Sequence, residues 1–484
     1  MAHKSSFIFL LCLLFALSLA ACTSTTPVPP TADQNAISTM VAATVQSAFT
    51  ATQHAIVDSQ STPLITPTPL PTQPNPTPSI STPTIPALPT PSFPTEQSLR
   101  IAYTKDGNVY LWSAGGGSIG LTDSYDVTDL RISDDGAYIA YKRQDLQNPN
   151  SQELWVVNTS GVPNPRILVS STELLEITPP DPASYILGAT VLDFVWRPNT
   201  HEVAYNTHIL HEGPGFGPNY DLRLVNADTL TKSTLFDTGK GGIFFYSPDG
   251  DQIALSMPDS ISQVNSDGSN LRGNVLTYPY VGTHSEYLYT PHPIWASDSS
   301  SLRAAIPPEE TLADPLPPTG LWLIPLDGSP AVLLSNVQAI PFAWPDNAFA
   351  PNLERVIYVT PLGDKTENQR ELRIANPDGS NDVAYDTGES LEFISWSPDS
   401  QHFIYQINGG TNEGVFLGGV NSQPDLVVFD PDVIQDIKWL GGNRLVFLFQ
   451  DGDQWQLLIH NLRDDVLTRV DTLPDTNPVF DTLP

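Results

Sequence analysis

A short phrase recurs along most of this chain, and it limits the possible folds more than any other feature. Residues 243–255 read IFFYSPDGDQIAL, and residues 393–405 read FISWSPDSQHFIY. Each copy is an apolar run, a tight turn and a second apolar run, which is the pattern of a β-hairpin. In the turn, proline presets one backbone angle and glycine accepts positive φ. Because the unit recurs along the chain, it predicts a repeat architecture.

A second kind of hairpin alternates with the first. The first kind lies around Ser133, Arg197, Ser247, Ser297, Pro345, Ser397 and Leu440. The second kind occurs in 109–122, 153–169, 221–236, 260–276, 320–334, 371–385, 414–429 and 455–470. Two alternating hairpins form a four-stranded antiparallel sheet, which is the blade of a β-propeller. The sequence therefore predicts an all-β propeller of eight blades, or of seven if one weak copy belongs to a loop.

The first blade begins at its second strand, LRIAY in residues 99–103. Its missing inner strand could come from residues 91–95 or from residues 478–482. The C-terminal choice would pair the two ends of the domain and remove exposed sheet edges. Both choices stay open at this point.

The N-terminus has the features of an export signal. Lys4 precedes an apolar run of 13 residues, 7–19, which is shorter than a membrane-spanning helix. Small residues follow up to Cys22. We therefore interpret residues 1–21 as a signal peptide.

The end of that signal contains a recognisable motif. Leu19, Ala20, Ala21 and Cys22 in succession resemble the lipobox of bacterial lipoproteins. In that family the peptide before the cysteine is removed and diacylglycerol is attached to the cysteine sulfur. The resemblance implies a lipid anchor at Cys22 on the extracytoplasmic side of the cell membrane. An ordinary signal peptide with a chance cysteine is the alternative.

A tether and a linker separate this signal from the repeats. In the tether, residues 22–60, the stretch 33–57 lacks proline and glycine and predicts a short helix. The linker, residues 61–97, is rich in proline and threonine, and we expect it to be disordered. At ~3.1 Å per residue it would span roughly 100 Å. The propeller domain is predicted for residues 98–484.

The repeats themselves resemble a known family. WSPDS in 396–400 and YSPDG in 246–250, each followed by an apolar strand, resemble TolB-type repeats. These are WD-repeat-like propeller units of exported bacterial proteins, and the resemblance covers about residues 98–470. It implies a propeller that binds proteins, peptides or saccharides, although a fold alone does not set a function. The enlarged turn in 344–359 and the segment 439–448, which lacks proline and aspartate, depart from the pattern.

The connections between hairpins are much longer than the turns within them. They cover 142–152, 170–192, 207–220, 278–292, 307–319 and 360–370. In a propeller the two kinds of connection emerge on opposite faces. Because long loops on a rigid scaffold usually carry the binding groups, we expect the binding surface on the face with these connections.

Two of the long connections contain candidate binding residues. Residues 207–220 contain His208, His211 and Glu212. The two histidines are three residues apart in a segment rich in glycine and proline, so they do not match the helical zinc motif, and we predict no metal. The second connection supplies Tyr278, Tyr280, His284, Tyr287 and Tyr289. Such tyrosines suit stacking on a saccharide or contact with a protein, and packing against the outer blade is the alternative.

Charge and motifs exclude several functions. The formal net charge of −32 repels phosphate backbones, so we expect no nucleic acid partner. Residues 116–120 match G-x-S-x-G, but they lie in a hairpin turn and not in the strand–turn–helix of a nucleophile elbow. No catalytic residue and no cofactor are predicted. We expect a monomeric, non-enzymatic module that binds a protein, peptide or glycan. The alternative is a propeller enzyme acting on glycans or peptides of the cell envelope or the extracellular space.

Overall fold

The structure is a computed structural model that describes only part of the chain. The described residues are 99–177, 186–211, 218–285, 288–341, 348–363, 368–428 and 430–483. Contacts divide the chain into two units, Met1–Leu88 and Pro89–Pro484, and all described residues belong to the second. The predicted signal peptide, the lipobox with Cys22, the tether and the linker therefore lie outside the described residues. Among the described residues, no helix is long and apolar enough to cross a membrane.

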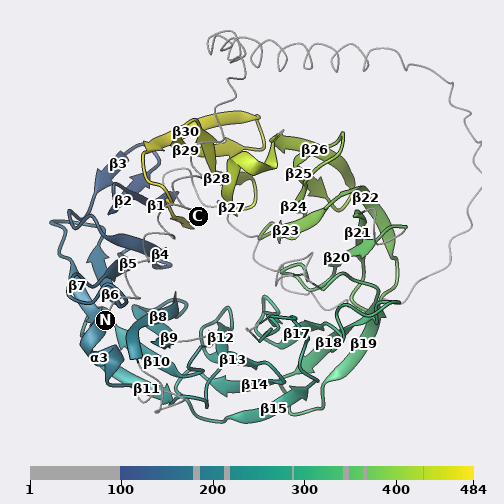
Figure 1. Ribbon diagram of the computed structural model, residues 1–484, viewed down its shortest axis with the longest axis horizontal. Coiled ribbons are helices and arrows are strands. Elements are labelled where there is room, and N and C mark those ends of the chain that lie inside the picture. The colour runs from purple at the N-terminus through teal and green to yellow at the C-terminus, as the bar shows by residue number, and fades with distance from the viewer. Residues whose placement is uncertain are drawn as a thin grey trace, which may run out of the picture. The chain divides into compact units, whose positions relative to one another are not determined.

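The described residues form eight antiparallel sheets that follow one another around a ring (Figure 1). Seven sheets have four described strands and one has three. This arrangement is an eight-bladed β-propeller, which confirms the predicted fold class and the higher blade count. The described helical segments are α3 (Ser171–Leu175) and the 3-10 turn η3 (Pro431–Val433).

The first four blades each contain four strands, ordered from the innermost to the outermost. Blade 1 consists of β31 (Phe480–Leu483), β1 (Arg100–Lys105), β2 (Asn108–Ser113) and β3 (Gly117–Gly120). Blade 2 consists of β4 (Val127–Ile132), β5 (Tyr138–Gln144), β6 (Gln152–Asn158) and β7 (Arg166–Val169). Blade 3 consists of β8 (Ile186–Trp196), β9 (Glu202–His211), β10 (Leu222–Asn226) and β11 (Lys232–Phe236). Blade 4 consists of β12 (Ile243–Tyr246), β13 (Gln252–Met257), β14 (Ser260–Asn265) and β15 (Arg272–Thr277).

The remaining blades follow the same order. Blade 5 consists of β16 (Ile294–Trp295), β17 (Ser301–Ile306), β18 (Thr319–Pro325) and β19 (Val332–Val337). Blade 6 consists of β20 (Val356–Pro361), β21 (Gln369–Ala375) and β22 (Val383–Glu389), and the turn expected around Pro345 lies outside the described residues. Blade 7 consists of β23 (Glu392–Trp396), β24 (His402–Ile407), β25 (Gly414–Gly419) and β26 (Ser422–Val428). Blade 8 consists of β27 (Ile434–Trp439), β28 (Arg444–Asp451), β29 (Gln454–Asn461) and β30 (Val466–Leu473).

The C-terminal strand closes the ring. Strand β31 pairs antiparallel with β1, from Arg100 opposite Leu483 to Tyr103 opposite Phe480. The Phe480 side chain is buried in the core between blades 8 and 1. Of the two possible closing strands, the structure therefore uses the C-terminal one.

The recurring Ser-Pro-Asp turn is held by its own side chains. In the turn after β12, the Ser247 hydroxyl donates to the Asp249 carboxylate, which also accepts from the Asp251 N–H at 3.0 Å. Gly250 adopts a φ of 75°, the left-handed region that glycine tolerates best. The same serine–aspartate bond forms in the turns that begin at Ser133 and Ser397, at 2.8 and 2.6 Å. The repeated sequence therefore builds a repeated, internally satisfied turn.

A repeated tryptophan at the end of an inner strand joins neighbouring blades. Trp196 Nε1 donates to the Arg131 carbonyl at 3.0 Å, and Trp295 Nε1 donates to the Phe245 carbonyl at 2.9 Å. In each case the acceptor belongs to the inner strand of the preceding blade. The structure thus places Trp295 in the core.

We name the two faces of the ring by their connections. The turn face carries the turns within hairpins, and the loop face carries the connections between hairpins. The predicted connections 170–192 and 207–220 are wrong in part, because β8 begins at residue 186 and β9 extends to residue 211. The two strands pair over this extra length, up to Ile186 opposite His211, which satisfies their backbone groups beyond the ends of the neighbouring strands.

Candidate functional site

The predicted histidines lie in a strand and not in a loop. His208 is buried in β9 opposite Thr190, and His211 ends the same strand opposite Ile186. Glu212 lies outside the described residues. Among the described residues, no group of three His, Cys, Asp or Glu side chains could hold a metal ion. The histidines therefore belong to the β8–β9 hairpin, which packs against the connection before β6, where Ser151 Oγ accepts from the Ala189 N–H at 3.0 Å.

The predicted tyrosines divide into half-buried and exposed members. Tyr278 packs on blade 5, and its hydroxyl donates to the Met257 carbonyl at 2.7 Å. Tyr289 is half-buried, whereas Tyr280 and His284 are exposed. Tyr287 lies outside the described residues. Of the described tyrosines in this set, Tyr280 is therefore the one that offers its ring to a partner.

The loop face brings two connections together near Tyr280. The Gly282 N–H donates to the Glu309 carbonyl at 2.9 Å, which joins the connection before β16 to the one before β18. Burial raises the pKa of Tyr220, and the neighbouring Tyr280 adds to that shift. Tyr220 lies in a third connection of this face, before β10. We call Tyr220, Tyr280 and the exposed Leu312 the loop-face patch.

Large exposed apolar side chains are unevenly distributed over the described residues. Twenty such side chains are exposed. Seven lie in connections of the loop face, namely Tyr125, Leu146, Leu175, Tyr280, Leu288, Leu312 and Leu362. Three lie in turns of the turn face, namely Val162, Leu230 and Leu271. Because exposed apolar groups that gather on one surface mark interaction sites, the loop face is the better candidate for contact with a partner.

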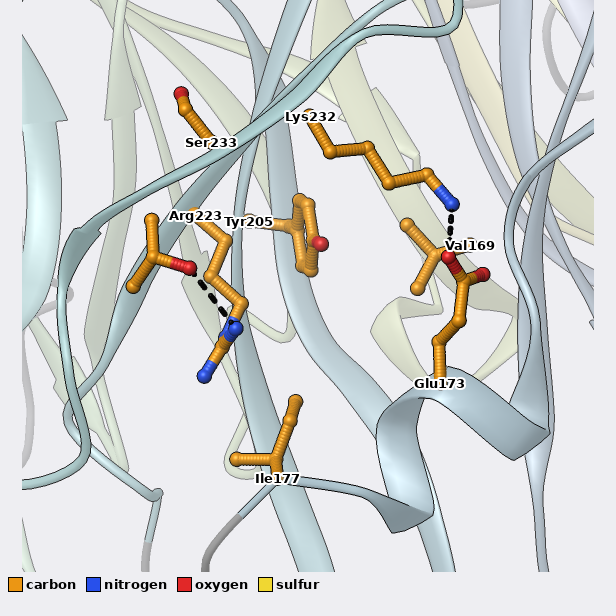
Figure 2. A pocket seen from close by; sticks show the side chains of 8 residues that line it. Val169, Glu173, Ile177, Tyr205, Arg223, Lys232 and Ser233 are labelled. Carbon is orange, nitrogen blue, oxygen red and sulfur yellow. Dashed lines mark hydrogen bonds and ion pairs between the residues drawn. The ribbon is translucent and has the colours of Figure 1, made fainter.

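A separate pocket lies at the outer edge of the seam between blades 2 and 3. Its volume is about 230 Å³. Its walls come from the end of β7, from α3 and from strands β9, β10 and β11, and the lining residues are Val169, Glu173, Ile177, Tyr205, Arg223, Lys232, Ser233 and Thr234. Figure 2 shows Tyr205 between Arg223 on one side and Glu173 with Lys232 on the other. We call this space the seam pocket.

Strand register places one wall of the seam pocket. Arg223 of β10 pairs with Tyr205 of β9 and with Thr234 of β11, so the three side chains point to the same face of blade 3. Arg223 Nε donates to Asp221 Oδ2 at 2.7 Å, and Nη1 donates to Thr234 Oγ1 at 3.1 Å. The Asp221 side chain is fully buried and also accepts the N–H and hydroxyl of Thr207 at 2.8 and 2.9 Å. These bonds hold the guanidinium in one orientation.

The opposite wall is built by the short helix α3. Ser170 and Glu173 form a capping box, in which each side chain bonds the backbone N–H of the other residue. Glu173 also forms an ion pair with Lys232. Burial opposes the charge of Glu173, but the bonds from Lys232 and Ser170 lower the pKa of its carboxyl group. The helix therefore fixes a charged carboxylate and an ammonium group at the mouth of the seam pocket.

Tyr205 forms the floor of the seam pocket. Its side chain is 4% exposed, and its hydroxyl makes no hydrogen bond to any residue that the structure describes. Burial, more than the neighbouring charges, raises the pKa of Tyr205, so the hydroxyl keeps its proton at neutral pH. It is thus a buried donor that faces an open space.

The sequence predictions missed the seam pocket, although one signal was present. Ser170 and Glu173 have the spacing of a capping box. The apolar residue Leu174 follows and is buried, as an amphipathic turn of helix requires. The rest of the pocket depends on residues more than fifty positions apart, which no local pattern connects.

The solved structures that this chain resembles are distant from it in sequence. No family model and no curated protein matches the sequence. A similar solved structure is TolB from Acinetobacter baumannii, with 10% identity, a TM-score of 0.31, and coverage of 58% of this chain and 68% of that chain. An oligogalacturonate lyase from Vibrio parahaemolyticus is similar with 11% identity, a TM-score of 0.40, and coverage of 71% and 85%. The β-propeller domain of the trilobed protease from Pyrococcus furiosus is similar with 12% identity, a TM-score of 0.39, and coverage of 59% and 84%. Similarity at this level concerns the propeller architecture alone.

Proposed function

We propose that this chain is an extracytoplasmic lipoprotein, anchored to the cell membrane through Cys22, whose propeller binds a protein, peptide or glycan with its loop face. The lipobox motif and the apolar run before it support the anchor. The proline-rich linker would hold the propeller away from the lipid surface. In this proposal the protein acts as a monomeric scaffold and not as an enzyme.

One observation carries the binding part of the proposal. The long connections and most exposed apolar loop residues lie on the loop face, whereas the turn face is made of short, repeated turns. Within these connections, Tyr280 is 55% exposed and Leu312 is 70% exposed. Tyrosine and leucine side chains provide a large contact area but few groups that could act as a general acid or base. They therefore suit binding of a partner more than catalysis.

The anchor is tested by Cys22→Ser in a bacterial host that acylates lipobox cysteines. We expect the wild-type protein in the membrane fraction and the variant in the soluble extracytoplasmic fraction. Retention of the variant in membranes after a high-salt wash would contradict a lipid anchor at this position.

The binding face is tested by capture of partners from the native cell envelope. A double variant Tyr280→Ser and Leu312→Ser should lose the captured partner, because both side chains lie in the loop-face patch. The matched control is Val162→Ser and Leu271→Ser, two exposed apolar residues of the turn face. Equal loss in both double variants, or loss in the control alone, would refute the assignment to the loop face.

A further inference from the structure

The seams between blades follow a pairing rule that the seam pocket breaks. In blades 2 to 8, one outer-strand residue lies opposite an apolar residue of the third strand, next to a β-bulge. This position is Asp471 opposite Leu457 in blade 8, and Asp386 opposite Leu372 in blade 6. We call it the seam position, because its side chain meets the second strand of the next blade.

Where the seam position is aspartate, the next blade supplies a tyrosine. The Tyr103 hydroxyl of β1 donates to Asp471 Oδ2 at 2.7 Å. The Tyr405 hydroxyl of β24 donates to Asp386 Oδ2. These two buried tyrosines therefore find a carboxylate across the seam. Tyr141, which packs with Leu121 at the seam between blades 1 and 2, has no hydrogen-bond partner among the described residues.

Where the seam position is apolar, the facing residue is usually apolar too. The pairs are Phe236 with Leu255, Leu276 with Ala304, and Val428 with Phe447. Such pairs need no acceptor, because both partners bury only carbon. In the first kind of seam the tyrosine hydroxyl has a hydrogen-bond acceptor. In the second kind no acceptor is needed.

The seam between blades 2 and 3 combines an apolar residue at the seam position with a facing tyrosine. Val169 occupies the seam position opposite Leu154, but the next blade supplies Tyr205. The valine methyl groups cannot accept a hydrogen bond, so the Tyr205 hydroxyl is left without the carboxylate that Tyr103 and Tyr405 have. The seam pocket opens at this place, with Val169 and Tyr205 both in its lining.

The seam between blades 8 and 1 shows which group occupies the corresponding position beside a tyrosine, namely a carboxylate. There Asp471 accepts from the Tyr103 hydroxyl and also from Lys105 Nζ at 2.7 Å. The seam pocket likewise offers a tyrosine hydroxyl and a cationic side chain, namely Tyr205 and Arg223. We propose that the seam pocket binds the carboxylate group of a small ligand in the place of the missing aspartate.

The charged side chains around the seam pocket leave hydrogen-bond donors available for a ligand carboxylate. Lys232 is paired with Glu173, whose second oxygen accepts from the Ser170 N–H and hydroxyl at 2.8 and 2.9 Å. The Arg223 Nε is bonded to Asp221, but no hydrogen bond to a described residue occupies its Nη2. Both pocket carboxylates therefore have their own partners, while Tyr205 and one edge of Arg223 remain as donors for a ligand.

The size of the seam pocket limits the ligand. Its volume of about 230 Å³ lies below the range of roughly 300–1,000 Å³ typical of pockets for drug-sized molecules. It therefore suits a single residue that carries a carboxylate, such as the C-terminal residue of a peptide or one sugar acid. This site is separate from the loop-face patch and does not depend on the function proposed for that patch.

Paired acid and neutral probes test the charge requirement. The full chain in mild detergent is titrated calorimetrically with N-acetylalanine and galacturonic acid, and with their neutral counterparts, N-acetylalanine amide and galactose. We expect at least one acid to bind at millimolar concentration and its neutral counterpart to bind at least tenfold more weakly, a difference of about 1.4 kcal/mol. The acid that binds distinguishes a peptide end from a sugar acid. Equal binding of an acid and its neutral counterpart, or no binding of either acid, would overturn the proposal.

Variants at the seam position test the location. Val169→Asp should abolish binding, because its own carboxylate would take the ligand's place as Asp471 and Asp386 do in their seams. Val169→Ala is the control and should retain binding.

Tyr205→Phe removes only the hydroxyl and should weaken binding about two- to tenfold, the effect of one hydrogen bond. Tyr141→Phe, which removes a buried hydroxyl that lies outside the pocket lining, should change nothing. Unchanged binding by both Val169→Asp and Tyr205→Phe would place the ligand elsewhere and refute the site.

Discussion

The two faces of the propeller are built from the same strands but differ in almost every other respect. On the turn face, serine and aspartate side chains satisfy the turn from within, and the same bonds recur in the turns that begin at Ser133, Ser247 and Ser397. On the loop face, the connections differ in length and sequence, and exposed tyrosines and leucines gather there. The difference teaches that repetition in this chain stabilises the ring, whereas departures from the repeat form the surfaces available to other molecules.

The largest contrast is expected between a repeated core residue and an exposed residue of the loop face. Trp396 packs against Phe393 and Phe403, and its Nε1 donates to the Ala348 carbonyl at 3.1 Å. Trp396→Ala should lower the free energy of unfolding by about 3–5 kcal/mol, because it leaves a cavity and an unpaired carbonyl. Leu312→Ala should change it by less than about 0.5 kcal/mol. Urea unfolding of both variants measures the difference, and similar losses would show that the loop face also supports the ring.

Local patterns predicted the repeated part of the molecule and failed where the chain departs from the repeat. The turn with Asp249 could be predicted, because it depends on residues that are neighbours in sequence. Helix α3 was missed because five residues show no helical period, and its position depends on the ion pair from Glu173 to Lys232.

The seam pocket shows a different limit of sequence reasoning. Val169 and Tyr205 are ordinary strand residues, and each fits its own strand. Their conflict appears only when the register of blade 2 is placed beside that of blade 3. Residues that are unremarkable in sequence can therefore define a site through a mismatch between neighbouring repeats.

An intermediate effect is expected from the turn that repeats. The Asp249 carboxylate accepts from the Ser247 hydroxyl and from the Asp251 N–H. Asp249→Ala should lower the free energy of unfolding by about 1 kcal/mol, since two local hydrogen bonds are lost from an exposed turn. Glu310→Ala, at an exposed position of the loop face, is the matched control and should have no measurable effect. Equal unfolding midpoints for the two variants in urea would mean that the repeated aspartate does not stabilise its turn.

The smallest effect, and the one that depends on pH, concerns a link between three turns of the turn face. His201 Nε2 contacts Asp135 at 2.9 Å, and its Nδ1 contacts Asp228 at 2.8 Å. The bonds to Asp135 and Asp228 raise the pKa of His201. Burial opposes the charge of Asp135, but bonds from Ala137, His201 and Ser133 lower its pKa to about 2. The doubly protonated imidazole thus joins the turn of blade 2 to the turns of blade 3.

The direction of the pH dependence follows from these shifts. Because the pKa of His201 is raised on folding, its contribution is complete below the unfolded value near 6.5 and is lost as pH rises through the folded value. The contribution of Asp135 is complete above about 3.9 and is lost as pH falls toward 2. The link is therefore strongest between these limits.

His201→Gln should reduce the stability at about pH 5.5 relative to about pH 8.5, by less than about 1 kcal/mol because the groups are partly exposed. His284→Gln, an exposed histidine of the loop face, should leave the wild-type difference intact, and a variant at His201 with the same pH dependence as the wild type would show that this link contributes nothing.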